Sequence, residues 1–226
     1  METGAGPPVR SGPVDTGAMP ARRIRAYIGL GANLGEAEAT LARAVDALAA
    51  LPGARLRGVS RLYATEPVGP TDQPEFRNAV VALDVPAGAD FAAGALGLLA
   101  SLKALERSFG RVARERWGPR ELDLDLLIYG RARLTVDPPP AGLSIDAETD
   151  PAKASKLLVV PHPAAAARLF VLAPLADLVP GLVPPRWHVT VETARRRQRA
   201  IEGPGAVRPV GTWDPTLGAW RADQPR

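Results

Sequence analysis

The chain has no cysteine among its 226 residues, which excludes disulfide bonds and thiolate metal sites. It also has no run of eighteen apolar residues, so no segment is long enough to span a membrane as a helix. The first 23 residues lack the continuous apolar stretch of a secretory signal. These absences predict a cytoplasmic protein without a membrane partner, and the length suits one domain with a sizeable core.

The middle of the chain has no net positive charge. Residues 1–25 carry a net charge of +2 and residues 186–226 carry +4, whereas residues 26–185 carry −2. A nucleic-acid-binding core normally has the opposite distribution, with its basic residues in the folded domain. We therefore expect no nucleic-acid partner.

Composition divides the chain into a central domain and two extensions. Residues 1–23 are rich in Gly and Pro and are expected to be disordered. The predicted domain spans 24–185 and contains a solvent-exposed insertion at 131–156. Residues 186–226 form a C-terminal extension, with a short helix expected near 189–201 and an irregular tail after it. Three tryptophans indicate that this tail packs against something: Trp187, Trp213 and Trp220.

Apolar periodicity and Gly/Pro breaks predict a strand, a helix, two strands, a helix and a strand. This βαββαβ order is typical of an α+β ferredoxin-like sandwich. We expect Gly29, Gly31 and Gly35 to form a tight turn after the first strand. The expected elements are 24–30, 36–51, 55–63, 76–85, 89–109 and a strand around Asp123.

The segment RWGPRELDLDLL, residues 116–127, is the most informative part of the sequence. Asp123 and Asp125 alternate with leucines, so in a strand both carboxylates leave by the face opposite the core. Their Cα atoms would lie roughly 6.6 Å apart, where two unit charges repel by about 2 kcal/mol at an effective dielectric of 20. A divalent cation would relieve that repulsion, and Mg²⁺ prefers one or two carboxylates completed by phosphates and water.

Arginines precede these carboxylates, and guanidinium groups suit phosphate oxygens. The combination suggests a magnesium-nucleotide enzyme. An edge strand with a solvated face and an arginine-rich turn would give the same pattern, because a DxD motif is short and often arises by chance. The arginines are Arg111, Arg114, Arg116 and Arg120.

WGPRELDLDLL resembles the signature of the 6-hydroxymethyl-7,8-dihydropterin pyrophosphokinase family. Three further segments are similar to that family in the same order, and together the resemblance covers about residues 24–185. They are IGLGANLGE (28–36), LYATEPVGPTDQPEFRNAVVAL (62–83) and VPHPAAAARLFVLAPLADLVP (160–180).

The resemblance implies a ferredoxin-like fold and a folate-biosynthesis enzyme that transfers the terminal pyrophosphoryl group of ATP to the hydroxymethyl oxygen of the reduced pterin. AMP is the second product. It also implies two magnesium ions held by Asp123 and Asp125 and catalytic roles for Arg111 and Arg120. Such chemistry asks mainly for positioning and charge neutralisation. We expect ATP and the pterin as the only partners of a monomer.

The resemblance also implies the two substrate-binding sets. Phe76 and Phe170 would stack on the two faces of the pterin, and Asn78 would offer its amide to the ring edge. Thr65 and Val68 would add backbone groups, and Trp117 would lie between the two sites. The implied ATP-contacting residues are Lys103, Glu106, Arg114, Arg116, Arg120, Leu126, His162 and Arg168.

Several assignments stay open. Lys103 replaces a glutamine common in the family, and the alignment does not decide which of Arg111, Arg114 and Arg116 acts in catalysis. A ferredoxin-like RNA-binding module is one alternative, but the paired exposed aromatics that such sheets use are not found. An ordinary phosphotransferase that produces ADP is the other alternative.

Overall fold

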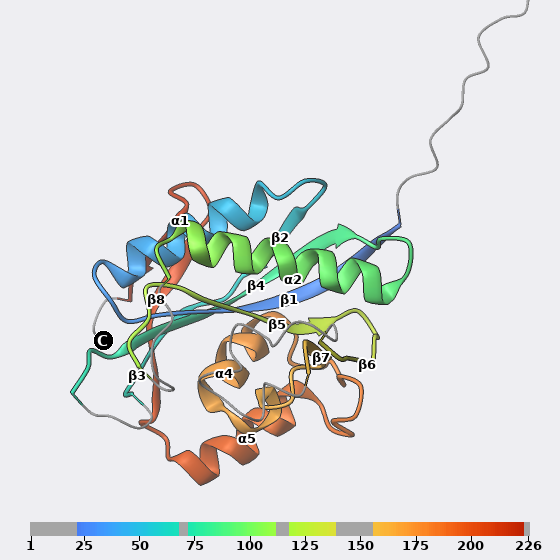
Figure 1. The fold of residues 1–226 in the computed structure, drawn as a ribbon. Helices are drawn as coiled ribbons and strands as arrows, with labels where there is room; N and C mark the ends of the chain where they lie inside the picture. The colour runs from blue at the N-terminus through green and yellow to red at the C-terminus, as the bar shows by residue number, and fades with distance from the viewer. Residues whose placement is uncertain (1–21, 68–71, 112–117, 139–155, 224–226) are drawn as a thin grey trace, which may run out of the picture.

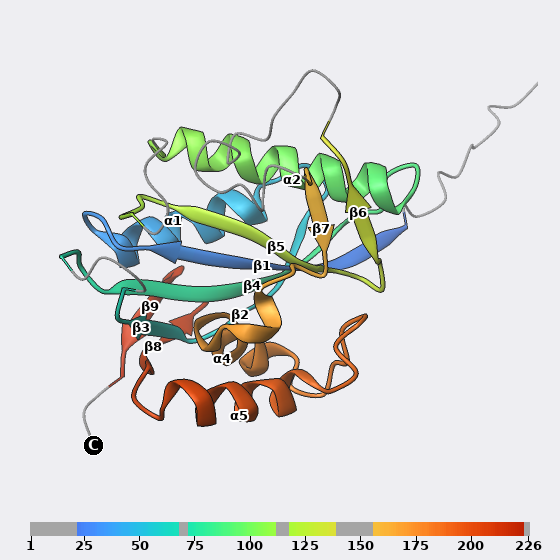
Figure 2. The same ribbon diagram turned by 60° about the horizontal axis from the view of Figure 1, so that its bottom comes forward.

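The expected order of elements forms one sheet with helices on both faces (Figures 1 and 2). The structure is a computed structural model that describes residues 22–67, 72–111, 118–138 and 156–223. Helices α1 (Ala37–Ala49) and α2 (Phe91–Ser108) cover one face. Helix α4 (Leu169–Leu178) lies on the other face, with α5 (Val191–Glu202) packed against it.

The main sheet is antiparallel throughout, in the order β5-β1-β4-β3-β8-β9, with β2 also pairing β4. Its first four positions are those of a ferredoxin-like sheet, so the predicted fold class is confirmed. The strands are β1 (Arg23–Ala32), β2 (Arg55–Val59), β3 (Leu62–Thr65), β4 (Phe76–Pro86), β5 (Asp123–Tyr129), β8 (Val207–Asp214) and β9 (Ala219–Ala222).

The core forms because helix and strand periodicities bring apolar side chains to the same layer. Leu41, Val45 and Leu48 recur at helical spacing on α1, and all three are fully buried against the sheet. Leu122 and Leu124, which alternate with the aspartates, are buried in the same cluster. The acidic face of β5 therefore points away from α1 and α2, as the alternation predicted.

The strand expected at 55–63 is two strands, because Ser60 interrupts its ladder. Ser60 N donates to the Val80 carbonyl over 3.0 Å, and Val80 N donates to the Ser60 hydroxyl over 2.9 Å. A side-chain oxygen thus replaces the backbone acceptor of a regular strand pair. Both β2 and β3 pair with β4, and β3 also pairs with β8 on its other side.

The C-terminal tail is more regular than the sequence indicated. Beyond α5, the strands β8 and β9 form a hairpin that extends the main sheet at β3. Trp213 and Trp220 pack edge to face with centroids 4.7 Å apart, and Trp220 Nε1 donates to the Ser60 carbonyl over 2.9 Å. The expectation of an irregular tail was wrong, because the strand signal depends on pairing with a segment about 145 residues earlier.

A strand at the start of the predicted insertion pairs with a strand that directly follows the insertion. Strands β6 (Leu134–Val136) and β7 (Leu158–Val160) form a small antiparallel sheet beside β5. Residues 139–155 lie outside the described part of the chain, as do residues 1–21. The expectations of a solvent-exposed insertion and a disordered N-terminus therefore remain predictions there.

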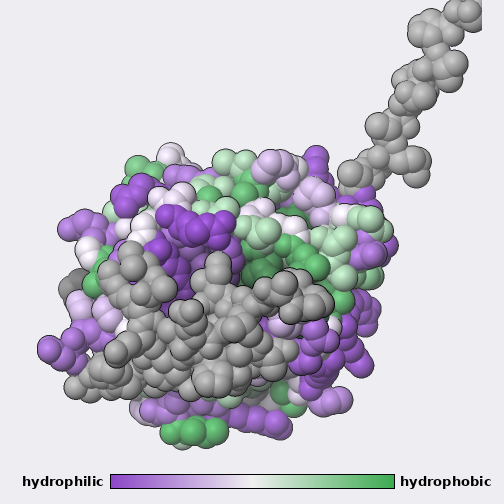
Figure 3. Space-filling view, viewed as in Figure 1, coloured by the Kyte–Doolittle hydropathy of each residue, from purple (hydrophilic) through white to green (hydrophobic). Residues whose placement is uncertain are grey.

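The surface in the view of Figure 1 is largely hydrophilic at its margins, with a hydrophobic patch near its centre (Figure 3). Among the helices of the described residues, none combines the length and the hydrophobicity needed to cross a bilayer.

Candidate active site

Asp123 and Asp125 project from β5 into a cleft on the α4 side of the sheet. The cleft has polar and apolar walls from three strands and one helix, and Asn78 and Phe170 also line it. Across the sheet, Asp123 pairs with Gly31 and Asp125 pairs with Gly29. Gly31 in turn pairs with Asn78, so carboxylate, glycine and amide form one row across three strands.

The two glycines form the floor of this cleft. A Cβ at Gly31 would lie 3.4 Å from Asn78 Oδ1, and one at Gly29 would lie 3.4 Å from the Leu127 side chain. The expectation that both belong to a turn was wrong, because they lie within β1, and only Gly35, with φ +55°, follows the strand. Their lack of side chains leaves open space above the sheet between the acidic and the amide positions.

Two guanidinium groups meet on the Asp123 carboxylate. Arg111 Nη1 lies 3.0 Å and Arg120 Nη1 lies 3.1 Å from the same oxygen, Oδ1. Asp125 makes no ion pair within the described residues. The two carboxylates therefore differ, although they share a strand and a face: Asp123 makes direct ion pairs with two guanidinium groups, whereas Asp125 interacts with the Lys103 ammonium only at longer range.

Glu106 links α2 to the exposed edge of β5. It follows Leu102 by four residues on the buried stripe of α2 and is 2% exposed. Its Oε1 accepts Leu124 N over 2.7 Å and lies 3.1 Å from Lys103 Nζ, and it also pairs with Arg111. The carboxylate thus satisfies a backbone donor that an edge strand would otherwise leave unpaired.

The charged groups in this cluster shift one another's pKa values. Burial raises the pKa of Glu106, and Asp123 adds to that effect, against the opposing influence of Lys103 and Arg111. Burial would lower the pKa of Lys103, but the nearby carboxylates of Glu106, Asp125 and Asp123 outweigh it, so the pKa is raised and Lys103 stays charged at neutral pH.

Asn33, which was not among the predicted site residues, links the segment before β5 to the loop before β4. Its Oδ1 accepts Arg120 N over 2.7 Å, and its backbone N donates to the Arg120 carbonyl over 3.0 Å. Its Nδ2 donates to Gln73 Oε1 and to the Pro74 carbonyl, each over 3.1 Å. At 3% exposure, this amide fixes Arg120 relative to the loop before β4.

The expected pterin-side residues of β3 and β4 lie together. Asn78 Nδ2 donates to Thr65 Oγ1 over 2.9 Å, and both residues are buried. Phe76 pairs with Thr65 across the strands and lies two residues before Asn78, hence on the same face. Phe76 is half-buried and lies just outside the residues that line the cleft.

Helix α4 and the segment before it supply the opposite wall. Phe170 lines the cleft, and the Arg168 guanidinium lies 5.7 Å from the centre of its ring. His162 N donates to the Leu127 carbonyl over 2.9 Å and so covers the free edge of β5. His162 Nδ1 accepts Ala164 N over 3.3 Å, which leaves the ring proton on Nε2 in the neutral form.

Comparison with known proteins identifies the family. Residues 27–180 match the 7,8-dihydro-6-hydroxymethylpterin-pyrophosphokinase family. The chain belongs to this family. A relative from Pseudomonas aeruginosa, a 2-amino-4-hydroxy-6-hydroxymethyldihydropteridine pyrophosphokinase, is 44% identical over 158 residues, which are 70% of this chain and 82% of the relative. One of the same name from Methylorubrum extorquens is 38% identical over 184 residues, 81% of this chain and 98% of the relative.

A solved structure shows the same fold at low identity. The wild-type Plasmodium falciparum HPPK-DHPS, crystallised with pterin and p-hydroxybenzoate, superposes with a TM-score of 0.63 at 12% identity. The match covers 91% of this chain but only 49% of that one, so this chain spans about half of the fused protein. The family match over residues 27–180 and the two relatives confirm the resemblance to the pyrophosphokinase family inferred from four sequence segments.

Some predicted site residues of the pyrophosphokinase lie elsewhere or outside the described chain. The Leu126 side chain is 3% exposed and belongs to the core under α1 and α2, so only its backbone faces the β5 edge. The remaining four lie outside the described residues: Val68, Arg114, Arg116 and Trp117.

The described residues contain no group of three or more His, Asp or Glu side chains placed to hold a metal ion. Two carboxylates on one strand face are what the site offers. That set suits a cation such as Mg²⁺, which takes its other ligands from phosphates and water. The two guanidinium groups on Asp123 also show that this position attracts positive charge.

Proposed function

We propose that the cleft over Gly29 and Gly31 transfers a pyrophosphoryl group from ATP to 6-hydroxymethyl-7,8-dihydropterin and releases AMP. The observation that carries this proposal is the row Asp123, Gly31 and Asn78, which joins an acidic, arginine-flanked end to an amide-bearing end in one family-matched cleft. One end suits a charged triphosphate and the other suits a flat heterocycle with hydrogen-bonding edges. The pterin hydroxymethyl group would lie between them.

The amide end would hold the pterin. Phe170 offers a ring face, and Phe76 lies on the facing strand, so the two aromatic side chains can bracket the heterocycle. Stacking of this kind stabilises a bound base by about 1–3 kcal/mol per aromatic ring. Asn78 is oriented by its bond to Thr65, which fixes which amide atoms face the ring edge. Val68 and Trp117 stay in this set as predictions from the sequence.

The basic end would hold the triphosphate. Arg111 and Arg120 already lie beside the carboxylates, and Lys103 keeps its charge. His162 can donate from Nε2, and Arg168 lies across the cleft beside Phe170. Guanidinium groups give paired, directional bonds to phosphate oxygens, and such groups supply most of what phosphoryl transfer needs from a protein. Arg114 and Arg116 remain candidates in the segment between them.

Asp123 and Asp125 would hold magnesium, and two ions are proposed. When bound, the metal neutralises charge on the phosphate oxygens and fixes their orientation. The chain's own contribution is to present both carboxylates on one face, at a spacing that β5 sets. Arg111 and Arg120 balance the Asp123 carboxylate, and with a cation bound there they would be available to phosphate.

The family's reaction breaks the bond between the α- and β-phosphates of ATP and forms one from the pterin hydroxymethyl oxygen to the β-phosphorus. Incubation of the protein with ATP, Mg²⁺ and the reduced pterin should therefore yield AMP and pterin diphosphate in equal amounts. Chromatography of the nucleotides measures this directly. Accumulation of ADP would instead support the ordinary phosphotransferase.

We also propose that one chain suffices for activity. Strands β1, β4 and β5 and helix α4 of one chain supply the described lining of the cleft. Light scattering of the active enzyme should give a mass near 23.8 kDa. Activity that disappeared on dilution into monomers would contradict this proposal.

A further inference from the structure

Helix α4 begins without a cap of its own. Its N-cap residue is Arg168, whose side chain does not bond to the first backbone N–H groups of the helix. Such N–H groups have no partner inside the helix and need an external acceptor. Here Leu169 N donates over 2.9 Å to Glu202 Oε1, which belongs to the last turn of α5. A carboxylate at this position also complements the positive end of the helix dipole.

Glu202 is itself held in place. Gln198, one turn earlier on α5, donates from Nε2 to the same Oε1 over 2.7 Å. Helix α5 packs along α4, and Val191 and Ala194 are buried at the other end of α5 (Figure 2). The whole of α5 lies beyond residues 27–180, the part of the chain that matches the family.

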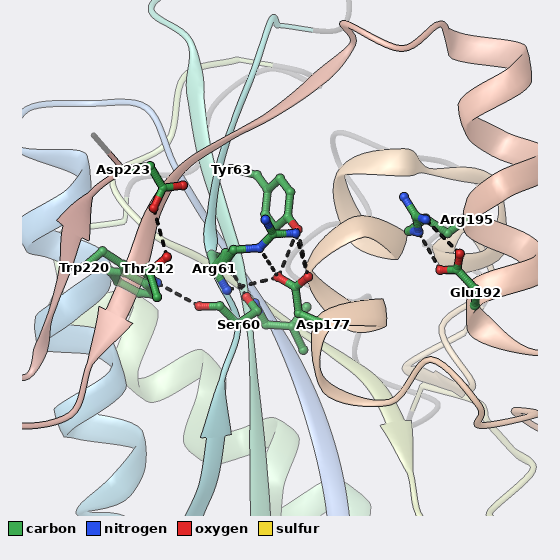
Figure 4. Close-up of polar contacts among 10 residues, drawn as sticks. Ser60, Arg61, Tyr63, Asp177, Glu192, Arg195, Thr212, Trp220 and Asp223 are labelled. Carbon is green, nitrogen blue, oxygen red and sulfur yellow. Dashed lines mark hydrogen bonds and ion pairs between the residues drawn. The ribbon is translucent and has the colours of Figure 1, made fainter. Parts of the chain in front are cut away.

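The far end of α4 is fixed to the sheet instead. Asp177 accepts the Arg61 backbone N–H over 3.1 Å and the Tyr63 hydroxyl over 2.9 Å, and it pairs with the Arg61 guanidinium (Figure 4). Burial raises the pKa of Tyr63, and Asp177 adds to that effect, so the hydroxyl stays protonated and donates. Both ends of α4 are thus attached, one to β3 and the other to α5.

The attached N-terminal end is the part of α4 that faces the cleft. Leu169, which receives the cap, lies between Arg168 and Phe170, and these two side chains contact each other over the aromatic ring. Loss of the cap would loosen the first helical turn, whereas the Asp177 end would stay in place. The ring face offered to the pterin would then lose its fixed orientation.

We propose that Glu202 is a positioning residue for pterin binding, which it controls through Leu169 and the first turn of α4. This proposal rests on the proposed function, because it takes Phe170 as a pterin-stacking residue. It extends the substrate-binding machinery to a helix beyond the family-matched segment. Glu202 itself does not touch the cleft.

The variant Glu202→Ala removes the acceptor. We expect the pterin KM to rise about fivefold, as loss of one helix cap predicts, with kcat nearly unchanged. The KM for ATP should rise less, because Arg111, Arg120 and His162 lie outside α4 and only Arg168 of the proposed triphosphate-binding groups adjoins the capped turn. Glu202→Gln keeps an acceptor oxygen and should restore the pterin KM to within about twofold of the wild type.

Glu192→Ala is the matched control on the same helix. Glu192 pairs with Arg195 and Arg196 on α5 and bonds to no side chain of α4 (Figure 4). The Glu192→Ala variant should have a lower Tm than the wild type and an unchanged pterin KM. A Glu202→Ala variant that behaved in the same way, with lower Tm and an unchanged pterin KM, would show that the cap is only structural.

Hydrogen exchange separates this proposal from the proposed function. In the ligand-free full-length enzyme, the Leu169 amide should exchange at least about fivefold faster in Glu202→Ala than in the wild type and in Glu192→Ala. Unchanged exchange would overturn the capping role whatever the enzyme catalyses. Failure of the wild type to produce AMP would overturn the proposed function while leaving the capping result to stand.

Discussion

Asp123 and Asp125 share a strand face but have different partners, and this difference was not visible in the sequence. The alternation with leucines correctly placed both carboxylates away from the core. It also suggested that the two charges repel each other and that either substitution relieves this. Two arginines on Asp123 change that expectation most, and the attraction between Asp125 and Lys103 changes it to a smaller extent.

Asp125→Asn should therefore leave the free energy of unfolding nearly unchanged, because the relief of its repulsion with Asp123 is offset by the loss of its attraction to Lys103. Asp123→Asn should lower it by about 1 kcal/mol, since two guanidinium groups lose a partly exposed carboxylate. Both variants should lose at least about 100-fold in turnover if each carboxylate holds metal. Urea denaturation and the rate at saturating Mg²⁺ check this, and near-wild-type rates in both would falsify the metal assignment.

Other residues of the site could not be predicted individually. Asn33 acts through Arg120, Gln73 and Pro74, and the nearest of these lies 40 residues away. No local pattern distinguishes an asparagine with such partners from one that starts a helix. The sequence resemblance identified the residue types expected near the substrates, but not the hydrogen bonds that hold them.

At the scale of the element, the two glycines of β1 matter to the cleft as much as the pairing of β1 with its neighbouring strands does. Gly29 and Gly31 were read as a turn because glycine in a strand is unfavourable and usually marks a break. The reason for their presence lies on the neighbouring strands, where Asn78 and Asp125 need open space above β1.

Gly31→Ala should be tolerated, because its Cβ would lie 3.4 Å from Asn78 Oδ1 and 4.0 Å from Asp123 Cβ, both ordinary contacts. Gly31→Val adds two methyl groups above the floor and should reduce turnover by at least about tenfold, with a change in stability below about 1.5 kcal/mol. Gly97→Ala is the control, since a Cβ there meets nothing within 4 Å and should stabilise α2 by up to about 1 kcal/mol. Equal turnover in the Ala and Val variants would show that the floor does not limit the substrate.

Helix α5 should make the free energy of unfolding depend on pH. Hydrogen bonds from Arg195, partly opposed by burial and supported by Arg196, lower the pKa of Glu192 from 4.5 to about 2. A lowered folded-state pKa stabilises the fold above the unfolded value, and this stabilisation is lost as the pH falls from about 4.5 to about 2. Because these pairs lie at the surface, it should amount to about 1 kcal/mol or less.

Comparison of Tm for the wild type and Glu192→Gln across this pH range checks the stabilisation by Glu192. The wild type should be more stable at pH 6, and the two should converge as the pH approaches 2. A difference that persisted at the lowest pH at which both remain folded would mean that Glu192 stabilises the helix through packing and not through its charge.

On the scale of the whole molecule, the C-terminal hairpin makes the extension part of the main sheet. The βαββαβ order was predictable because each element carries its own periodicity and its own breaks. The hairpin was not, because β8 and β9 are held by β3 and by the Ser60 junction, far away in the sequence. Contacts with a distant segment also explain why the strand expected at 55–63 is two strands, since Ser60 bonds to Val80 at the point where they meet.

Variants of Trp220 test whether the β8–β9 hairpin unfolds together with the rest of the sheet. Trp220→Phe removes the donor to the Ser60 carbonyl and part of the ring, and should cost about 1–2 kcal/mol. Trp220→Ala also removes the contact with Trp213 and should cost about 2–3 kcal/mol. If the hairpin folds with the sheet, both variants should unfold in a single transition in calorimetry. A separate low-temperature transition in Trp220→Ala would show that the hairpin is an independent unit.

The pair of guanidinium groups on Asp123 has a consequence for how the two charged ligands depend on each other. If Arg111 and Arg120 leave Asp123 to bind phosphate, the carboxylate needs a new counterion, and if Mg²⁺ binds Asp123 first, both arginines lose that carboxylate, although Arg111 keeps its ion pair with Glu106. Each ligand thus supplies what the other displaces. Mg²⁺ should therefore tighten nucleotide binding, and by thermodynamic reciprocity the nucleotide should tighten Mg²⁺ binding by the same factor. In Asp123→Asn this linkage should weaken, because the arginines no longer have a carboxylate to exchange for phosphate.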